Sequence, residues 1–339
     1  MSNIKDVAKA AGVSTSTVSR VLNNNPLISF ETREHVMKVI REHNYVPNSM
    51  ARGLSTQKAS AVALLVNIED KDTDSFDNLF FHKIMYGIEN VLYKNDLSLV
   101  ISNLSNSRSS KERLNRMVQG KQIQGVIIPT LVLTPDLIKT LTAQKIPFVV
   151  IGEPEYTTVP FDWVDINNMQ GGQQAVQHLI ETDYKRIAFL GGEPGSLFNH
   201  KRLAGYRTML TQHNMPVDEA LIAECDGGKA GACAEMARLL ELTPPPDAVI
   251  CGNNIISLGA MKAIAEKGLT IPRDIGIISF DNYPIAELVE PTLTTIDINV
   301  YEMGVEAAKL ILKLMANPSA HHQVSLISTS IQVRESTIK

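Results

Sequence analysis

Small hydroxyl side chains and one arginine are gathered in a short segment near the amino terminus. Serine and threonine hydroxyls both donate and accept hydrogen bonds, and arginine adds a positive charge. On the first turns of a helix they would suit the base edges in the major groove of DNA. A plain helical hairpin would explain the turn in this segment, but not exposed hydroxyls beside an arginine. The residues concerned are Ser14, Thr15, Ser16, Thr17, Ser19 and Arg20.

A second set of polar residues follows apolar runs in the body of the chain. Asn253 comes directly after the run DAVICG, and its amide can both donate and accept hydrogen bonds with sugar hydroxyls. Asp281 ends the run IGIISFD, and its carboxylate can accept hydrogen bonds from two neighbouring hydroxyls. A helix cap is the alternative role for Asp281. Both residues therefore predict a small-molecule site.

Three short helices are predicted to position the first set. The segment 4–11 carries its apolar residues on one helical face, and Gly12 then turns the chain. Ser14 is well placed to cap a second helix at about 15–22, and a third helix follows at about 31–44. A helix, a glycine turn and a second helix with polar residues on its first turn form the helix-turn-helix motif.

From residue 61, short apolar runs alternate with helix-like stretches, which predicts parallel sheets covered by helices on both faces. The runs are too many for one compact sheet, and the pattern repeats after about residue 160, so we expect two similar Rossmann-like lobes. Ligands of such sheets bind in the crevice at the carboxyl ends of the strands. The runs include AVALLV (61–66), GVIIP (125–129), PFVVIG (147–152), RIAFLG (186–191), DAVICG (247–252), IGIISFD (275–281) and LTTIDI (293–298).

The charge of the chain is unevenly distributed. The net charge is −4 overall, but residues 1–60 carry eight Lys and Arg against four Asp and Glu. This segment is therefore at +4, which leaves −8 for the other 279 residues. A small basic end on an acidic body attracts phosphate at that end alone.

The composition predicts a cytoplasmic protein that neither spans a membrane nor holds a metal. No apolar run approaches the ~20 residues of a membrane span, and no signal peptide is recognised at the amino terminus. Cys225, Cys233 and Cys251 are odd in number and not spaced like metal ligands, which favours a reducing compartment.

Four motifs, in the right order along essentially the whole chain, resemble the lactose–galactose repressor family. They are DVAKAAGVSTSTVSRVLN, YVPNSMARGL, IISFDN and EPTLTTID. The resemblance implies that Thr15, Ser16 and Arg20 reach base edges, and a guanidinium can bind O6 and N7 of guanine as a pair. The alternative for Arg20 is a phosphate contact.

The same resemblance assigns a hinge at 47–60. Its segment 48–54 is a predicted helix too short to be stable alone, so we expect it to fold when two copies pair on DNA. Asn48 and Ala51 match positions that lie in the minor groove, and Leu54 matches a leucine wedged between base pairs. The alternative for Leu54 is packing beneath the linker.

In the body, the resemblance implies an effector site. Arg202 matches an arginine that grips hydroxyl or carboxylate groups, and Ser196 and Phe198 lie in the loop before it. Phe80 and Phe81 match an aromatic pair that could stack on a sugar or a base, although one of them should be a core residue. Asn254 departs from the acidic residue usual in the family, which removes any charge-based role there.

We therefore expect an all-α helix-turn-helix headpiece (1–46), a hinge (47–60) and a bilobed α/β core of the periplasmic-binding-protein type (61–339). The first lobe is predicted at about 61–160 with 293–323, and the second at about 161–292 with 324–339. The expected protein is a homodimer that binds a near-palindromic double-stranded operator and responds to a sugar or sugar phosphate. A purine or nucleoside effector is one alternative, and control by a phosphocarrier protein, through Lys309, is another. We find no enzyme motif and expect no cofactor.

Overall fold

A computed structural model describes residues 3–22, 25–43, 45, 60–66, 77–104, 108–155, 160–318 and 321–339. The chain divides into two units, and residues 1–60 make up nearly all of the first. The remainder forms the second unit, which contains two six-stranded sheets.

Three helices around a small apolar core form the first unit: α1 (Ile4–Ala10), α2 (Thr15–Leu22) and α3 (Phe30–Glu42). Gly12 has φ of +64°, a left-handed conformation that glycine adopts without strain and that turns the chain between α1 and α2. Ser29 caps α3 by accepting a hydrogen bond from the Thr32 N–H. The core consists of Val7, Ala8, Ala11, Val18, Val21, Val36, Val39 and Ile40.

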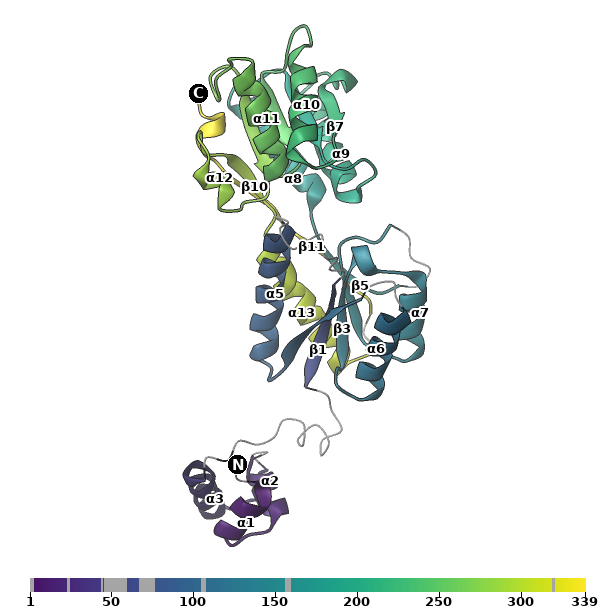
Figure 1. Ribbon diagram of the computed structural model, residues 1–339, viewed down its shortest axis with the longest axis vertical. Helices are drawn as coiled ribbons and strands as arrows, with labels where there is room; N and C mark the ends of the chain where they lie inside the picture. Colours follow the sequence, from purple (N-terminus) through teal and green to yellow (C-terminus); the bar gives the residue numbers. More distant parts are fainter. Residues whose placement is uncertain are drawn as a thin grey trace. The chain divides into compact units, whose positions relative to one another are not determined.

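The first lobe of the second unit is a parallel sheet in the order β11-β5-β4-β3-β1-β2. Helices α5 and α13 cover one face, and α6 and α7 cover the other (Figure 1). Every residue of β1 is buried, as expected for a strand covered on both faces. Its elements are β1 (Ala61–Val66), α5 (Asp77–Tyr93), β2 (Ser98–Asn103), α6 (Arg108–Gln119), β3 (Gly125–Pro129), α7 (Pro135–Ala143), β4 (Phe148–Ile151), β5 (Asp162–Ile166), α13 (Val300–Ala316) and β11 (Val324–Ile327).

The second lobe has the sheet order β12-β10-β9-β8-β6-β7. Its strands pair in parallel except for β12, which runs antiparallel to β10. Helices α8 and α9 pack on one face, and α10 and α11 on the other. Its elements are α8 (Asn168–Glu181), β6 (Ile187–Gly191), α9 (Leu197–Gln212), β7 (Ile222–Glu224), α10 (Lys229–Leu240), β8 (Ala248–Cys251), α11 (Asn254–Glu266), β9 (Gly276–Phe280), α12 (Ile285–Leu288), β10 (Thr294–Asp297) and β12 (Ser330–Gln332).

The lobe boundaries differ from the sequence prediction at three strands. β5 and β11 belong to the first sheet, whereas β10 belongs to the second. The chain crosses between the lobes directly after each of these strands, so a strand and the element that follows it lie in different lobes. Apolar patterning reports that a strand is buried and not which sheet it joins.

Hydrogen bonds tie the three crossing segments together. The Asn299 side-chain amide donates to the Ser328 carbonyl at 2.6 Å. The Asn167 backbone N–H donates to the Ile327 carbonyl at 2.8 Å. Asn299 itself has φ of +48°, a left-handed conformation that asparagine tolerates better than most residues. The crossing segments therefore form one bonded set.

Glycines allow one helix pair in each lobe to approach closely. A Cβ added at Gly304 would lie 2.3 Å from the Ile84 carbonyl oxygen on α5. In the second lobe, a Cβ at Gly172 of α8 would lie 2.1 Å from the carbonyl oxygen of Arg202 on α9. Real side chains do not approach backbone atoms this closely, so glycine is required at both crossings.

Candidate nucleic-acid interface and ligand site

Helix α2 presents hydroxyls and an arginine at its surface. Thr15, Ser16 and Arg20 are exposed, and Thr17 is half-buried. The Ser14 hydroxyl accepts a hydrogen bond from the Thr17 N–H at 3.1 Å, so it caps the helix as predicted. The exposed side chains are the predicted base-reading residues, and Ser14 and Thr17 position the turn that carries them.

The hinge predictions concern a segment outside the described residues. Asn48, Ala51 and Leu54 all lie there, and their roles in the minor groove stay predictions that rest on the resemblance. Among the described residues, the predicted DNA-binding side chains all lie on α2 or at its amino end.

In the second unit, Arg202 is the centre of a buried polar cluster. Its side chain is only 5% exposed, and its Nε donates to the Asn168 side-chain Oδ1 at 2.9 Å. One Nη1–H donates to the Gly252 carbonyl at 2.7 Å. The guanidinium lies 4.1 Å from the ring centroid of Phe280 and 5.1 Å from that of Phe198. These contacts fix the position of the guanidinium.

Two carboxylates compensate the charge of this arginine. Burial lowers the pKa of Arg202, and Asp281 and Asp165 oppose that shift. Asp165 accepts hydrogen bonds from the backbone N–H groups of Ile166 at 2.7 Å and Glu153 at 3.2 Å. Burial nevertheless raises the pKa of Asp165. Both carboxylates favour the charged form of the guanidinium, because a negative charge nearby stabilises a cation.

Ser196 and Asn253, both predicted ligand residues, act as helix caps in the structure. The Ser196 hydroxyl accepts from the Asn199 N–H at the start of α9, and the Asn253 side-chain oxygen accepts from the Ile256 N–H at 2.8 Å. Their capping oxygens are thus engaged within the protein. Phe198, in the first turn of α9, is half-exposed and presents an aromatic face near Arg202.

Phe80 and Phe81 serve the packing of α5. Their ring centroids lie 5.9 Å apart in an edge-to-face arrangement, and both rings pack against the buried core. The sequence predicted a core role for one of them, and the structure gives this role to both. The core role accounts for their positions without a ligand.

Asn254, which follows a predicted ligand residue, supports the turn at Asp281. Its Nδ2 donates to the Asp281 carbonyl at 2.9 Å and to the Ser279 hydroxyl at 2.8 Å. Asp281 has φ of +73°, a strained conformation for a non-glycine residue, and these bonds hold it. Asn254 itself is only 3% exposed. The neutral side chain of Asn254 therefore positions the turn at Asp281, a role that was not predicted from the sequence.

Sequence reasoning also missed two contacts between the lobes. Lys201 forms an ion pair with Glu153, which follows β4 of the first lobe. Lys83 of α5 donates to the Asn282 carbonyl at 3.1 Å and lies 4.9 Å from the ring centroid of Tyr283. In the sequence, only the position of Lys201 next to Arg202 could have pointed to either of these contacts.

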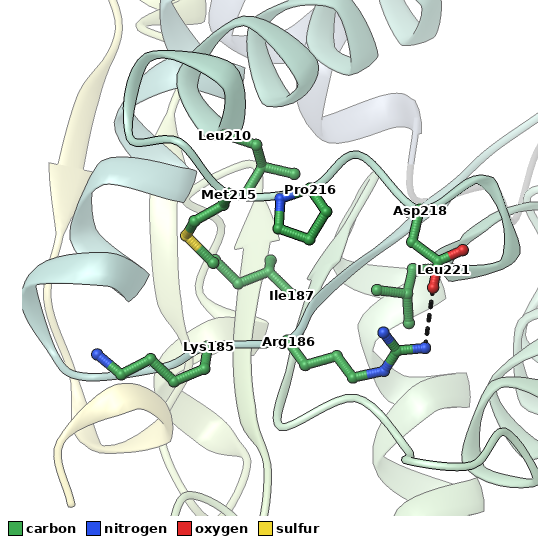
Figure 2. A pocket seen from close by; sticks show the side chains of 8 residues that line it. All are labelled: Lys185, Arg186, Ile187, Leu210, Met215, Pro216, Asp218 and Leu221. Atoms are coloured by element: carbon green, nitrogen blue, oxygen red, sulfur yellow. Dashed lines mark hydrogen bonds and ion pairs between the residues drawn. The ribbon is translucent and has the colours of Figure 1, made fainter.

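One small pocket lies away from this cluster, near the amino end of β6. Figure 2 shows the ion pair between Arg186 and Asp218 at its edge, at 3.0 Å. Its volume of about 30 Å³ suits about two water molecules and not a sugar ring. Its lining residues are Lys185, Arg186, Ile187, Leu210, Met215, Pro216, Asp218 and Leu221.

The described part of the chain offers neither a membrane span nor a metal site. No helix in it is long and apolar enough to cross a bilayer, and no three His, Cys, Asp or Glu side chains gather as metal ligands. The three cysteines are not in disulfides. Burial raises the pKa of Cys251 to about 12, so this residue remains a thiol at neutral pH.

Two family models match the chain. Bacterial regulatory proteins of the lacI family match residues 3–48, and a periplasmic binding protein-like domain matches residues 176–337. Among individual relatives, catabolite control protein A of Priestia megaterium is 31% identical, over 98% of both chains. The transcriptional regulator CelR of Thermobifida fusca is 33% identical over 97% of this chain and 96% of that protein. The repressor PurR of Vibrio atlanticus is 32% identical over 100% of this chain and 99% of that protein.

Solved structures of similar proteins cover the whole chain. A complex of CelR with cellobiose has a TM-score of 0.71 at 30% identity and covers 99% of this chain and 100% of that one. The lac repressor dimer bound to operator and the anti-inducer ONPF has a TM-score of 0.79 at 25% identity and covers 100% of this chain and 99% of that one.

Proposed function

Because this chain belongs to the lacI family of bacterial regulatory proteins, we propose that it represses a carbohydrate-utilisation operon under the control of a sugar bound between its two lobes. It is a DNA-binding transcriptional regulator with a small-molecule effector, and its relatives are regulators rather than enzymes. We further propose that it acts in the cytoplasm as a homodimer on a near-palindromic operator, since a two-fold protein requires two half-sites.

The cluster around Arg202 carries the proposal for a sugar effector. Sugar hydroxyls accept hydrogen bonds from a guanidinium and donate them to carboxylates, and Asp281 and Asp165 lie close enough to Arg202 to affect its pKa. The half-exposed ring of Phe198 offers an apolar face for the ring of the sugar. A relative with the same fold, CelR, is solved with cellobiose.

On the DNA side, Arg20 would read a guanine, and Thr15 and Ser16 would contact neighbouring bases. Asn48, Ala51 and Leu54 would lie in the minor groove at the centre of the operator. A ligand that prefers one arrangement of the lobes would change operator affinity through the pair of hinges, with a coupling of about 1–3 kcal/mol.

The proposal is tested by selecting duplexes that the purified chain binds and then adding candidate sugars to the complex. Arg20→Ala should relax the base preference at one position of each half-site and cost about 1–3 kcal/mol on the preferred operator. The exposed Arg41 on α3 supplies a matched control, because Arg41→Ala should leave base preference unchanged. Uniform weakening by Arg20→Ala on all sequences would instead identify a phosphate contact. Equal affinity for every duplex would refute the proposed function.

A purine effector is the second candidate, favoured by the half-exposed Phe198 ring and the likeness to PurR. Thermal-shift measurements with hypoxanthine, guanine and a panel of sugars distinguish a purine effector from a sugar effector, since only the true class of ligand should raise the unfolding midpoint. Control by a phosphocarrier protein has weaker support, because Lys309 pairs with Glu306 of its own helix at 3.7 Å. This pairing reduces the positive charge that an anionic partner would meet.

A further inference from the structure

One edge of the first lobe carries exposed lysines. The loops that lead from a helix into the amino end of a strand form this edge: 94–97, 120–124, 144–147 and 317–323. Lys94, Lys121 and Lys145 lie there, all three exposed, and among the described residues none of them forms an ion pair. Three lysines against the single aspartate, Asp96, give these loops a net charge of +2, with histidine counted as neutral. Asp96 lies in the same loop as Lys94 and offsets its charge, so the excess belongs to Lys121 and Lys145.

The corresponding loops of the second lobe have the opposite net charge, and their cations are paired. These loops are 182–186, 213–221, 241–247, 267–275 and 289–293. They contain four Lys and Arg against seven Asp and Glu, a net charge of −3. Each of the four cations forms an ion pair: Lys185 with Asp183, Arg186 with Asp218, Lys267 with Glu241 and Arg273 with Asp274. The same edge of a similar lobe is therefore built without free positive charge.

The ends of the helices do not require these lysines. Lys121 and Lys145 have φ of +50° and +54°, the left-handed conformation in which helices commonly end. A lysine there also interacts favourably with the carbonyl end of the helix. In the second lobe, however, the residues in this conformation after α8 and α9 are Asp183 and Asn214, with φ of +68° and +55°. Because helices of this fold end equally well without a cation, the two lysines are available for an external anion.

Ala61, the first residue of β1, joins this edge to the predicted hinge. It lies opposite Ser98, the first residue of β2, and its carbonyl accepts from the Gln124 N–H at 2.9 Å. Gln124 belongs to the same loop as Lys121. The chain that leads from the DNA-binding unit thus enters the second unit at this edge. The anions that a DNA-binding unit brings with it are backbone phosphates.

We propose that Lys121 and Lys145 form a second DNA contact, which binds backbone phosphates beside the segment that α2 reads. Lysine is a compact point charge that meets a phosphate without a defined geometry, so this contact carries no base preference. It adds affinity and salt dependence to binding and leaves sequence specificity to the first unit. The inference rests on DNA binding by the first unit and not on the identity of the effector.

The test measures the affinity of the full-length chain for duplex DNA as a function of salt concentration, with Lys121→Gln/Lys145→Gln as the double variant. Each phosphate contact adds about 0.9 to the slope of log affinity against log salt, so the variant should have a slope lower by about 2 per chain. Raising the salt from about 50 to about 200 mM should then weaken binding by the native chain about tenfold more than binding by the variant. Lys121→Arg/Lys145→Arg keeps both charges and should keep the native slope.

Lys185→Gln/Lys267→Gln is the matched control, because it removes the same charge from the second lobe, where both lysines are paired with acids. Its slope should equal that of the native chain. An unchanged slope in the first-lobe variant, or an equal fall in the control, would overturn the inference. The loss should also be the same on a selected operator and on a random duplex of equal length, and a loss confined to the operator would contradict a phosphate contact. The preference of the native chain for the operator over the random duplex tests the proposed function separately.

Discussion

The two lobes share one architecture but contribute different charged side chains to the ligand site. Each has a helix pair that crosses at glycines, Gly304 in the first lobe and Gly172 in the second. The first lobe supplies the carboxylates Glu153 and Asp165 together with Lys83, and the second supplies the cations Lys201 and Arg202 together with Asp281. Because Lys201 of one lobe pairs with Glu153 of the other, charged groups near the ligand site also hold the lobes together.

The helix crossing has different consequences in the two lobes. In the first lobe, the close contact at Gly304 joins α13 to α5 and serves packing. In the second, the contact at Gly172 places α8 against the backbone of Arg202, and Asn168 of the same helix accepts from its Nε. A close helix crossing at glycine is thus common to both lobes, and in the second lobe it also positions Arg202.

Removal of Arg202 should have the largest effect. Arg202→Met should weaken sugar binding by about a hundredfold or more, because Asp281 and Asp165 would lose the cation that compensates them. Arg207→Met on the same helix is the control, since Arg207 pairs with Glu219 at the surface. Calorimetric titration of both variants with the sugar measures the loss of affinity in each. Comparable losses in the two variants would show that α9 responds to any lost arginine.

Alanine at the two glycine crossings should have the next largest effect. Gly304→Ala and Gly172→Ala should each lower the free energy of unfolding by about 1–3 kcal/mol, because the added Cβ meets a backbone oxygen. Urea unfolding measures this loss. Only Gly172→Ala should also weaken sugar binding, since it displaces Arg202. Equal loss of sugar affinity in both variants would remove the proposed difference between the lobes.

Substitution of Asp165 should have the smallest effect, and it depends on pH. Burial raises the pKa of Asp165 above its ordinary value of 3.8, so the folded chain holds this proton more tightly than the unfolded chain. The stability that the protonated group contributes is present below that ordinary value and is lost as the pH rises through the folded pKa. The asparagine of Asp165→Asn has no proton to lose. The variant should therefore gain stability relative to the native chain as the pH rises from 3.8 through the folded pKa.

Thermal unfolding midpoints of both chains, measured from about pH 4 to pH 7, test this expectation. An asparagine oxygen can still accept one of the backbone hydrogen bonds that Asp165 receives. A difference between the chains that stays constant with pH would mean that the carboxyl is not perturbed by its surroundings.

Local signals in the sequence were sufficient for the first unit. The predicted helix at about 15–22 agrees with α2 (Thr15–Leu22), and Ser14 caps the helix that it was predicted to cap. Caps and helix periodicity involve residues a few positions apart, so the sequence itself contains both partners. The two-lobed α/β core was also predicted, from the alternation of apolar runs with helical stretches.

Long-range contacts in the core could not be predicted in this way. Glu153 and Lys201 lie in different lobes, and no local pattern joins them. The sheet that β10 joins depends on where the chain crosses, which periodicity does not report. Asn253 was predicted to bind hydroxyls, yet the same side-chain oxygen serves equally well as a helix cap.

The bonded set of crossing segments determines how the lobes can move. Asn299 and Asn167 bond the segments after β10 and β5 to the end of β11 and the residue that follows it. Three crossing segments joined in this way should resist twisting more than bending. An opening motion of the core should therefore follow one bending axis, with the three segments moving together. If the lobes can bend about one axis alone, ligand binding should produce a single defined change in the angle between them.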